Sequence, residues 1–407
     1  MTDGTDAARG ARVGTAGEVF LAFARLGLTA FGGPVAHLGY FRTEFVDRRH
    51  WLDDHAFADL VALCQFLPGP ASSQVGMALG LMRAGPLGAL AAFVGFTAPS
   101  AIAMLVFALG FAHFGGAAGG GLHGLKVAAV AVVAGALLGM IRTLAATRET
   151  ASLAVAGMAL AVLVPGVAGQ LAAIGCGAAV GLLLARRGGG VTASGGSTGL
   201  DGGLGVGAGL GLLGLFAVVT LGLPIAAAAS GGGALGLVDA FWRAGSLVFG
   251  GGHVVLPLLQ AEMVETGRVS ADAFLAGYGA AQAVPGPLFT FAAFLGAAET
   301  ATPNGVLGGT IALMAIFAPS FLLVAGALPF WERLRGLAAA RAAMVGVNAA
   351  VVGLLGAAFL DPVWARGICG PADAVIAVAA FVALTSWKIP PWAVVVACAL
   401  AGLGLGG

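Results

Sequence analysis

Residues 65–70 of the chain read Gln-Phe-Leu-Pro-Gly-Pro, and residues 282–287 read Gln-Ala-Val-Pro-Gly-Pro, each inside an apolar stretch. Proline lacks a backbone N–H and stops an α-helix, so each triplet predicts a break in a helix. In a bilayer the freed backbone groups must be paired within the protein or face a wet cavity, because lipid offers no hydrogen-bond partner. The two stretches therefore predict two helices that break inside a membrane protein.

Two further motifs recur in the same order. Residues 25–37 read Arg-Leu-Gly-Leu-Thr-Ala-Phe-Gly-Gly-Pro-Val-Ala-His, and residues 243–253 read Arg-Ala-Gly-Ser-Leu-Val-Phe-Gly-Gly-Gly-His. Ala-Pro-Ser at residues 98–100 recurs at residues 318–320. The three motifs are offset by 218, 217 and 220 residues, a regularity that indicates two copies of one fold. Paired broken helices in the two halves of a membrane protein are typical of a transporter's binding site.

Composition supports a membrane protein. Hydrophobic residues make up 59% of the 407 residues, charged residues only 9%, and the mean hydropathy is +1.00. A soluble domain carries roughly a quarter charged residues. The net charge of +1 and the lack of a basic stripe argue against a nucleic-acid partner. The four cysteines lie apart in apolar sequence, which favours buried hydrophobic positions over a disulfide or a metal site.

Apolar stretches of about 20 residues predict an all-α polytopic membrane protein with roughly thirteen transmembrane helices. The expected spans cover 16–39, 56–82, 86–112, 122–144, 151–165 and 168–185 in the first half, a lone span at 204–229, and 234–257, 271–298, 304–329, 341–360, 372–387 and 391–406 in the second. The expected parts of the chain are an N-terminal tail (1–15), a first repeat (16–185), a flexible linker (186–203), an unpaired helix (204–229) and a second repeat (230–407).

The unpaired helix predicts how the repeats are oriented. Six helices return the chain to its starting side, so a seventh inserts the second repeat in inverted topology. Cytoplasmic loops of membrane proteins carry an excess of Lys and Arg. With the N-terminus inside, the loops expected inside include those with Arg83, Arg142, Arg268 and Lys388. The loop at 42–55, which carries three arginines, is the exception because it would face outside.

The segments after the breaks are suited to bind an anion. A helix N-terminus carries positive partial charge and free N–H groups. After Pro70 come Ser72 and Ser73, which add hydroxyl donors, whereas Thr290 is the hydroxyl donor after Pro287. In inverted repeats the two helix starts are expected to approach one another near the midplane. The alternative is that each Pro-Gly-Pro marks an ordinary turn at the membrane surface.

Charged residues accompany the second motif. Arg25 and Arg243 each lie six residues before the phenylalanine of Phe-Gly-Gly, and charge inside a membrane is by default functional. A guanidinium forks onto oxyanions, whereas at the end of a span it extends to the membrane surface instead. His37 and His253 either donate to an anion or are hydrogen-bonded interior histidines.

Glycines and glutamines complete the candidate site. Consecutive glycines allow backbone conformations barred to other residues, and tight helix crossing is their alternative role. Gln65 and Gln282 either line the cavity or hydrogen-bond helices together. The candidate substrate-binding residues are Arg25, Gly32, Gly33, His37, Gln65, Pro68, Gly69, Pro70, Ser72, Ser73, Arg243, Gly250, Gly251, His253, Gln282, Pro285, Gly286, Pro287 and Thr290.

The sequence shows no sign of an enzyme. It lacks the Gly-x4-Gly-Lys-Ser/Thr phosphate loop, a nucleophile elbow, and any His, Cys or carboxylate cluster at metal-ligand spacing. We therefore expect no catalytic residue, no metal and no cofactor, and no ATP-driven step within this chain.

Taken together, the motifs resemble those of the chromate ion transporter (CHR) family. The resemblance rests on Phe31-Gly-Gly-Pro with His37, on Trp51-Leu-Asp with Phe57, and on the repeated Pro-Gly-Pro stretches. It covers nearly the whole chain apart from the tail, the linker and the unpaired helix, as in the long, two-domain form of the family. The second copy departs from the first, since Phe at 289 stands where the first copy has Ser72.

The resemblance implies a multi-pass protein of the bacterial inner (plasma) membrane that exports chromate from the cytoplasm and confers chromate resistance. Its partners would be chromate, the chemically similar sulfate and the lipid bilayer. A dianion leaving a negative interior gains about 4.6 kcal/mol per 100 mV, so the membrane potential or proton coupling can drive export. The alternatives are a carrier of sulfate or another oxyanion and an anion channel, with a membrane enzyme more remote. The oligomeric state stays open, a homo-oligomer included.

Overall fold

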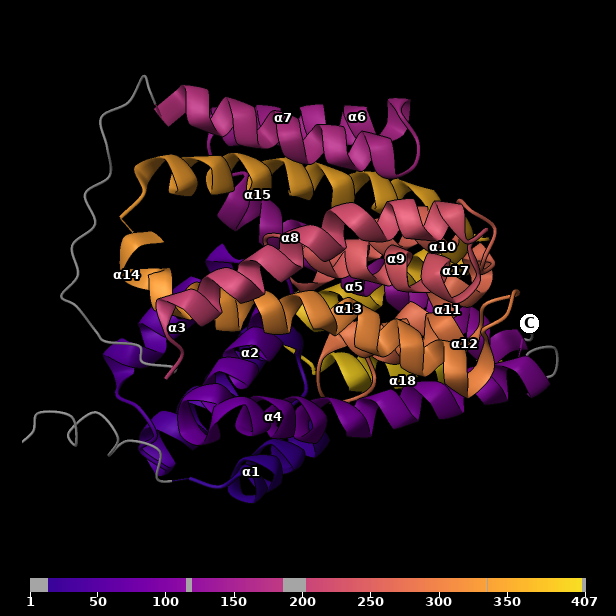
Figure 1. Cartoon of the computed structure of the whole chain (residues 1–407). Coiled ribbons are helices and arrows are strands. Elements are labelled where there is room, and N and C mark those ends of the chain that lie inside the picture. The colour runs from indigo at the N-terminus through magenta and orange to yellow at the C-terminus, as the bar shows by residue number, and fades with distance from the viewer. Residues whose placement is uncertain (1–13, 115–118, 186–202, 335, 405–407) are drawn as a thin grey trace, which may run out of the picture.

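The computed structural model describes residues 14–114, 119–185, 203–334 and 336–404, and every regular element in these residues is a helix (Figure 1). Most of the expected tail (1–15) and linker (186–203) lies outside the described residues. Six of the described helices are long and apolar enough to span a membrane, and three shorter apolar helices accompany them. The all-α membrane fold is confirmed.

The helices fall into two series joined by one long helix. The first series is α1 (Ala16–Thr29), α2 (Gly33–Phe41), η2 (Arg42–Arg48), α3 (Asp54–Phe66), α4 (Ala71–Phe114), α5 (Gly119–Leu144), α6 (Arg148–Leu163) and α7 (Val167–Ala185). The joining helix is α8 (Val206–Ala229). The second series is α9 (Gly233–Ser246), η3 (Gly252–Val254), α10 (Val255–Met263), α11 (Ala271–Ala281), η4 (Leu288–Thr290), α12 (Phe291–Ala297), α13 (Gly305–Ala327), η5 (Leu328–Phe330), α14 (Trp331–Leu334), α15 (Ala338–Ala358), η6 (Phe359–Trp364), α16 (Ala365–Gly367), α17 (Pro371–Thr385) and α18 (Pro391–Gly404).

The first broken segment of each repeat is a hairpin. α2 and η2 fold back along α1, so the ring of Phe23 lies 5.4 Å from that of Phe41 and 4.8 Å from that of Phe45. In the second repeat α10 folds back along α9, and Arg243 Nε lies 3.0 Å from Glu262 Oε1. The expected continuous spans at 16–39 and 234–257 are therefore absent from the described structure, because helices this short turn back before they cross about 30 Å of bilayer.

The second broken segment of each repeat is also a hairpin. α4 reverses direction at Ala84 and Gly85, whose backbone angles are not helical, and this reversal packs Gly80 against the backbone of Gly88. α3 and the first part of α4, up to residue 83, thus form a hairpin, and the rest of α4 is a separate long helix. In the second repeat α11 and α12 form the matching hairpin, after which α13 is the long helix.

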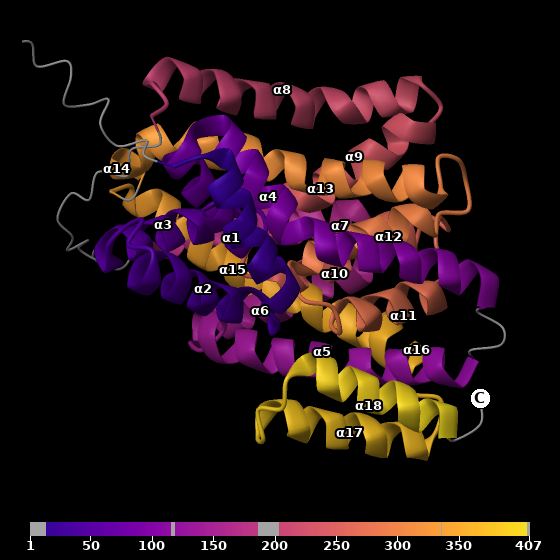
Figure 2. The ribbon, with the colours of Figure 1, turned by 90° about the horizontal axis from the view of Figure 1, so that it is seen from below.

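The hairpins leave the inverted topology intact. The long part of α4 and α5 cross the membrane and return the chain to its starting side, and the antiparallel pair α6 and α7 leaves it there, so α8 still inserts the second repeat in the opposite sense. Figures 1 and 2 show the long part of α4 running toward one end of the molecule, whereas α13, which contacts it, runs back toward α14 at the other end. The two repeats are therefore inverted copies.

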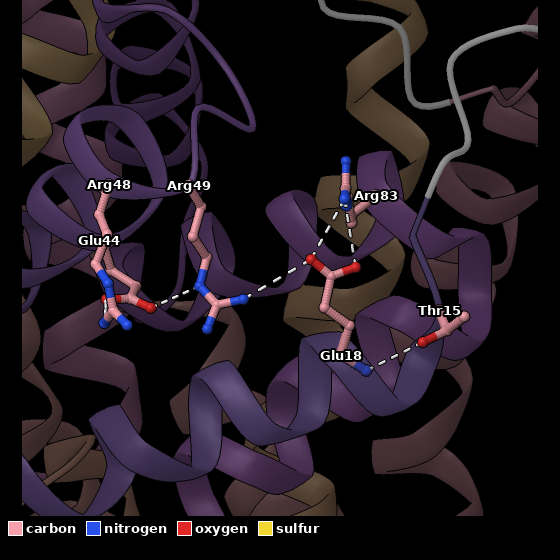
Figure 3. Close-up of polar contacts among 6 residues, drawn as sticks. All are labelled: Thr15, Glu18, Glu44, Arg48, Arg49 and Arg83. Carbon is pink, nitrogen blue, oxygen red and sulfur yellow. Dashed lines mark hydrogen bonds and ion pairs between the residues drawn. The ribbon is translucent and has the colours of Figure 1, made fainter.

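The hairpins also correct the expected placement of the arginine-rich loop at 42–55. Because α1 and η2 belong to one hairpin, this loop lies on the same side as the start of α1. Glu18 of α1 accepts from Arg83 at 3.3 Å and lies 3.7 Å from Arg49 (Figure 3). The loop therefore no longer violates the positive-inside rule. Arg268, which was expected inside, lies instead at the opposite end, paired with Glu299 at 3.5 Å.

Glu44 is the most buried acid of this network. Its carboxylate accepts from Arg49 Nε at 2.6 Å and from Arg48 Nη1 at 3.0 Å (Figure 3). Burial acts to raise the pKa of Glu44, but the hydrogen bonds and charges of Arg49 and Arg48 outweigh it and hold the pKa below its ordinary value. Its stabilising contribution is thus complete at neutral pH and is lost only as the pH falls through this lowered pKa.

Replacing Glu44 with Gln should lower the free energy of unfolding by about 1–3 kcal/mol, because the partly buried guanidinium of Arg49 loses its buried carboxylate partner. Asp47→Asn is the matched control, since its pair with Arg42 is about half exposed and is worth little. Thermal unfolding in detergent at pH 7 measures both variants. Equal melting temperatures for wild type and Glu44→Gln would contradict the assignment.

Candidate functional site

The breaks of the two repeats are hydrogen-bonded to each other across the molecule. The N–H of Gly69 donates to the carbonyl of Val248 at 2.8 Å, and the N–H of Gly286 donates to the carbonyl of Ala30 at 2.9 Å. Ala30 and Val248 each precede the phenylalanine of a Phe-Gly-Gly motif. The two bonds are therefore copies of one interaction, in which the Pro-Gly-Pro break of each repeat is tied to the Phe-Gly-Gly break of the other.

The third motif lies at the same contacts. A Cβ added at Gly69 would lie 2.7 Å from Ser320 Oγ, and one added at Gly286 would lie 2.8 Å from Ser100 Oγ. Both glycines have positive φ, 124° and 89°, a backbone region that favours glycine. Glycine is thus required at each position for two reasons: its φ is positive, and a larger side chain would clash with the serine of the opposite repeat.

Both glycines of each Phe-Gly-Gly motif have positive φ. Gly32 and Gly33 have φ values of 104° and 79°, and Gly250 and Gly251 have values of 77° and 141°. In the first repeat the turn starts α2 at Gly33, so the N-terminus of that helix points toward the break. The expected conformational role of these glycine pairs agrees with the structure.

A cavity of about 330 Å³ lies where the first Phe-Gly-Gly break meets the second Pro-Gly-Pro break. Its lining residues come from the first break, α5, the second repeat's breaks and the turn between α17 and α18: Gly32, Gly33, Val132, Gly135, His253, Ala281, Gln282, Val284, Gly286, Leu288, Leu384, Thr385, Lys388, Ile389, Pro390 and Pro391. Five of these are candidates from the sequence. No carboxylate belongs to this lining, so the described walls of the cavity favour an anion.

Other candidates lie close by but outside this lining. His37 is buried, with its Nδ1 3.4 Å from Ser72 Oγ, and Ser73 is also buried. The hydroxyl of Thr290 donates to the carbonyl of Pro287 at 2.8 Å. Gln65 is exposed. The remaining candidates outside the lining are Pro68, Gly69, Pro70, Gly250, Gly251, Pro285 and Pro287. The cavity therefore combines the Phe-Gly-Gly break of the first repeat with the Pro-Gly-Pro break of the second. The helix starts after Pro70 and Pro287, which were expected to meet, do not form it together.

The structure places neither motif arginine in the cavity. Arg25 lies on the exposed side of α1, whose opposite side buries Ala22, Phe23 and Leu26. Arg243 is paired with Asp239 and Glu262, so its charge is already compensated. The expectation that these two guanidinium groups face a common substrate is corrected, because helix periodicity turns one outward and two acids neutralise the other.

Comparison with known proteins identifies the family of this chain. The sequence model for "Chromate transporter" matches residues 17–182 and 235–403, which are the two inverted repeats. The chain belongs to the chromate transporter family. A chromate transport protein of Pseudomonas aeruginosa is 29% identical over 84% of this chain and 80% of its own length. A probable chromate transport protein of Synechococcus elongatus is 28% identical over 76% of this chain and 75% of its own length. No solved structure gave a significant match.

Sequence reasoning missed Lys388 as a cavity residue, although it carries the positive charge of the lining. Lys388 lies in the turn between α17 and α18, far along the chain from any repeated motif. A signal was nevertheless present, because the chain has two lysines and this one interrupts the apolar sequence Ser-Trp-Lys-Ile-Pro-Pro. The other, Lys126, is paired with Asp272 at 2.9 Å.

The sequence also did not reveal one cluster of residues of the types that bind metals, because these residues lie far apart in the chain. His123, Cys369 and Asp373 offer ligand atoms within 4.8 Å of one another. His123 Nε2 lies 2.8 Å from Asp373 Oδ1, and the other carboxylate oxygen accepts from the N–H groups of Cys369 and Gly370. These contacts cap the start of α17 and account for all three residues without a metal.

Gly69→Ala and Gly286→Ala should each lower the free energy of unfolding by about 2–4 kcal/mol, from an alanine at positive φ and the clash with a serine hydroxyl. Gly139→Ala is the matched control, because nothing lies within 4 Å of a Cβ added there. Thermal unfolding of the purified proteins in detergent reports the difference. If the three variants melted together, the cross-repeat contacts would not hold the breaks in place.

Proposed function

We propose that this protein is a secondary transporter that exports chromate from the bacterial cytoplasm across the inner membrane and thereby confers chromate resistance. The observation that carries the proposal is the cavity between the breaks of two inverted repeats, in a chain of the chromate transporter family. Relatives with long matches on this chain are named as chromate transport proteins. An oxyanion is also the ligand that the chemistry of the cavity favours.

The cavity offers an oxyanion several donors. Gly33 starts α2, and the start of a helix presents free N–H groups and positive partial charge. The side-chain amide of Gln282 and the ammonium group of Lys388 add donors from the second repeat and the last turn. No carboxylate of the described lining repels a dianion. These groups bind by charge and hydrogen bonds alone, without any covalent step.

The membrane potential is sufficient to drive export. A dianion that leaves a cell interior at −100 mV gains about 4.6 kcal/mol, which sustains a gradient of roughly a thousandfold. Uptake of the same ion would have to work against this energy. The orientation follows from the positive loops: with the start of α1 inside, Arg42, Arg48 and Arg49 also lie inside.

Inverted repeats supply a route to alternating access. The cross-repeat bonds of Gly69 and Gly286 are equivalent, yet the cavity lies beside only one of them. A transporter with inverted repeats that is open to one side of the membrane has its cavity beside one repeat's break and not the other's. Exchange of the roles of the two repeats would open the equivalent cavity on the other side. The breaks would act as the hinges of this motion.

The direct test is uptake of radiolabelled chromate into everted membrane vesicles, whose lumen corresponds to the cell exterior. Uptake should saturate with chromate concentration and rise when a lumen-positive potential is imposed. Vesicles without the protein are the control. Uptake that is unaffected by the potential would contradict an electrogenic uniport, and no uptake above the control would contradict chromate transport.

Competition in the same vesicles addresses the alternatives. If unlabelled sulfate inhibits the uptake of labelled chromate at a lower concentration than unlabelled chromate does, the protein is a sulfate carrier. Conductance recorded in planar bilayers, without saturation, would assign an anion channel. Export of chromate predicts saturable uptake in which unlabelled chromate competes best.

Gln282→Ala should raise the KM for chromate about tenfold, because the cavity loses one hydrogen-bond donor to a charged ligand. Gln65→Ala is the matched control: it is the equivalent residue of the first repeat, but it is exposed and outside the cavity lining. Vesicle uptake at several chromate concentrations gives the two KM values. Equal effects of both variants would show that the site is shared symmetrically between the repeats.

A further inference from the structure

The turn between α17 and α18 holds a lysine in an unfavourable backbone conformation. Lys388 has a φ of 55°, in the left-handed region that is unfavourable for a residue with a Cβ. Fourteen described positions with positive φ are glycines, and only His50 and Lys388 are not. In the matching turn of the first repeat, between α6 and α7, Gly166 takes the left-handed position with a φ of 82°. A lysine at such a position indicates a role for its side chain.

The turn itself is fixed against the first break. The N–H of Ile389 donates to the carbonyl of Ala383 at 2.9 Å, and two prolines follow before α18 begins. The ring of Trp392, at the start of α18, lies 6.0 Å from that of Phe31. Contacts on both sides of Lys388 thus hold this turn beside the Phe-Gly-Gly break.

Lys388 is also the only Lys or Arg among the described residues that line the cavity. The two basic residues of the second repeat's hairpins have acidic partners: Arg243 is paired with Asp239 and Glu262, and Arg268 with Glu299. No salt bridge to Lys388 occurs within the described part of the chain. No described acidic residue therefore neutralises the charge of Lys388 at this cavity.

We propose that Lys388 is the cationic substrate-binding residue of this transporter, which contacts the tetrahedral dianion at the cavity and takes the role that the sequence motifs had suggested for Arg25 and Arg243. The proposal rests on the proposed function and deepens it, since it assigns the charge that selects a dianion. An ammonium group is a compact point charge with three donors and suits an oxyanion that must also be released. The unfavourable left-handed conformation of Lys388 is offset by the placement of its ammonium group at the substrate.

The test separates binding from structure by means of three variants. Lys388→Gln should raise the KM for chromate in vesicles about tenfold or more, and Lys388→Arg should keep most of the affinity. Lys388→Gly should raise the melting temperature, because it removes the left-handed strain, and yet bind chromate as weakly as Lys388→Gln. Lys126→Gln, which removes the other lysine, should leave the KM unchanged. A wild-type KM in Lys388→Gln and Lys388→Gly would overturn the proposal.

Chemical restoration of the charge provides a second readout. In a background with Cys176 and Cys369 replaced by Ser, Lys388→Cys should lose affinity. Modification with a positively charged aminoethyl methanethiosulfonate should restore it, whereas the negatively charged sulfonatoethyl reagent should not. Restoration by both reagents, or by neither, would count against a role for the charge.

A binding assay keeps this proposal distinct from the proposed function. The melting temperature of the purified protein is measured with chromate, with sulfate and with chloride as control. If sulfate stabilises wild type but chromate does not, chromate export fails, and Lys388 is supported only if Lys388→Gln abolishes the sulfate shift. If neither dianion stabilises wild type, both proposals fail.

Discussion

The structure depends on a pair of backbone hydrogen bonds between helix breaks. Each Pro-Gly-Pro frees backbone groups at a depth where lipid offers no partner. The N–H groups of Gly69 and Gly286 are satisfied by carbonyls at the Phe-Gly-Gly breaks of the opposite repeat. Each break is thus satisfied by the other repeat, and this requires the two inverted copies to meet. The requirement to pair these groups also brings four irregular segments together, and irregular backbone is what lines a polar cavity in a membrane protein.

The hairpins follow from the same breaks. A helix stopped at Thr29 or at Phe66 is too short to cross the bilayer, so the chain returns to the side from which it entered. This return places the charged loop after α2 beside the start of α1, where Glu18, Glu44 and their arginines close the open ends of both hairpins (Figure 3). The apolar tips then carry the motifs to the centre, and the charges stay at the surface.

Much of this architecture could be predicted from the sequence, and the reasons for the rest are physical. The offsets between motifs predict two copies, because they are read directly from the sequence. The unpaired α8 predicts their inversion, because apolar stretches can be counted. The hairpins were missed because a break in an apolar stretch does not reveal whether the chain continues or reverses. The reversal at Gly85 depends on close packing of Gly80 on Gly88, which no local pattern displays. For the site, the glycines at the breaks were found because positive φ restricts them to glycine. Lys388 was missed because it reaches the cavity only through the packing of α18 beside Phe31.

We propose that the breaks of the two inverted repeats enclose one oxyanion site. A cryo-electron microscopy map of the protein in lipid nanodiscs, with chromate and without it, tests this proposal. We expect additional density in the presence of chromate between Gly33, Gln282 and Lys388, with the Gly69 and Gly286 backbone contacts in place. Chromate density at a site remote from both Pro-Gly-Pro breaks, or repeats that run in the same direction, would contradict it.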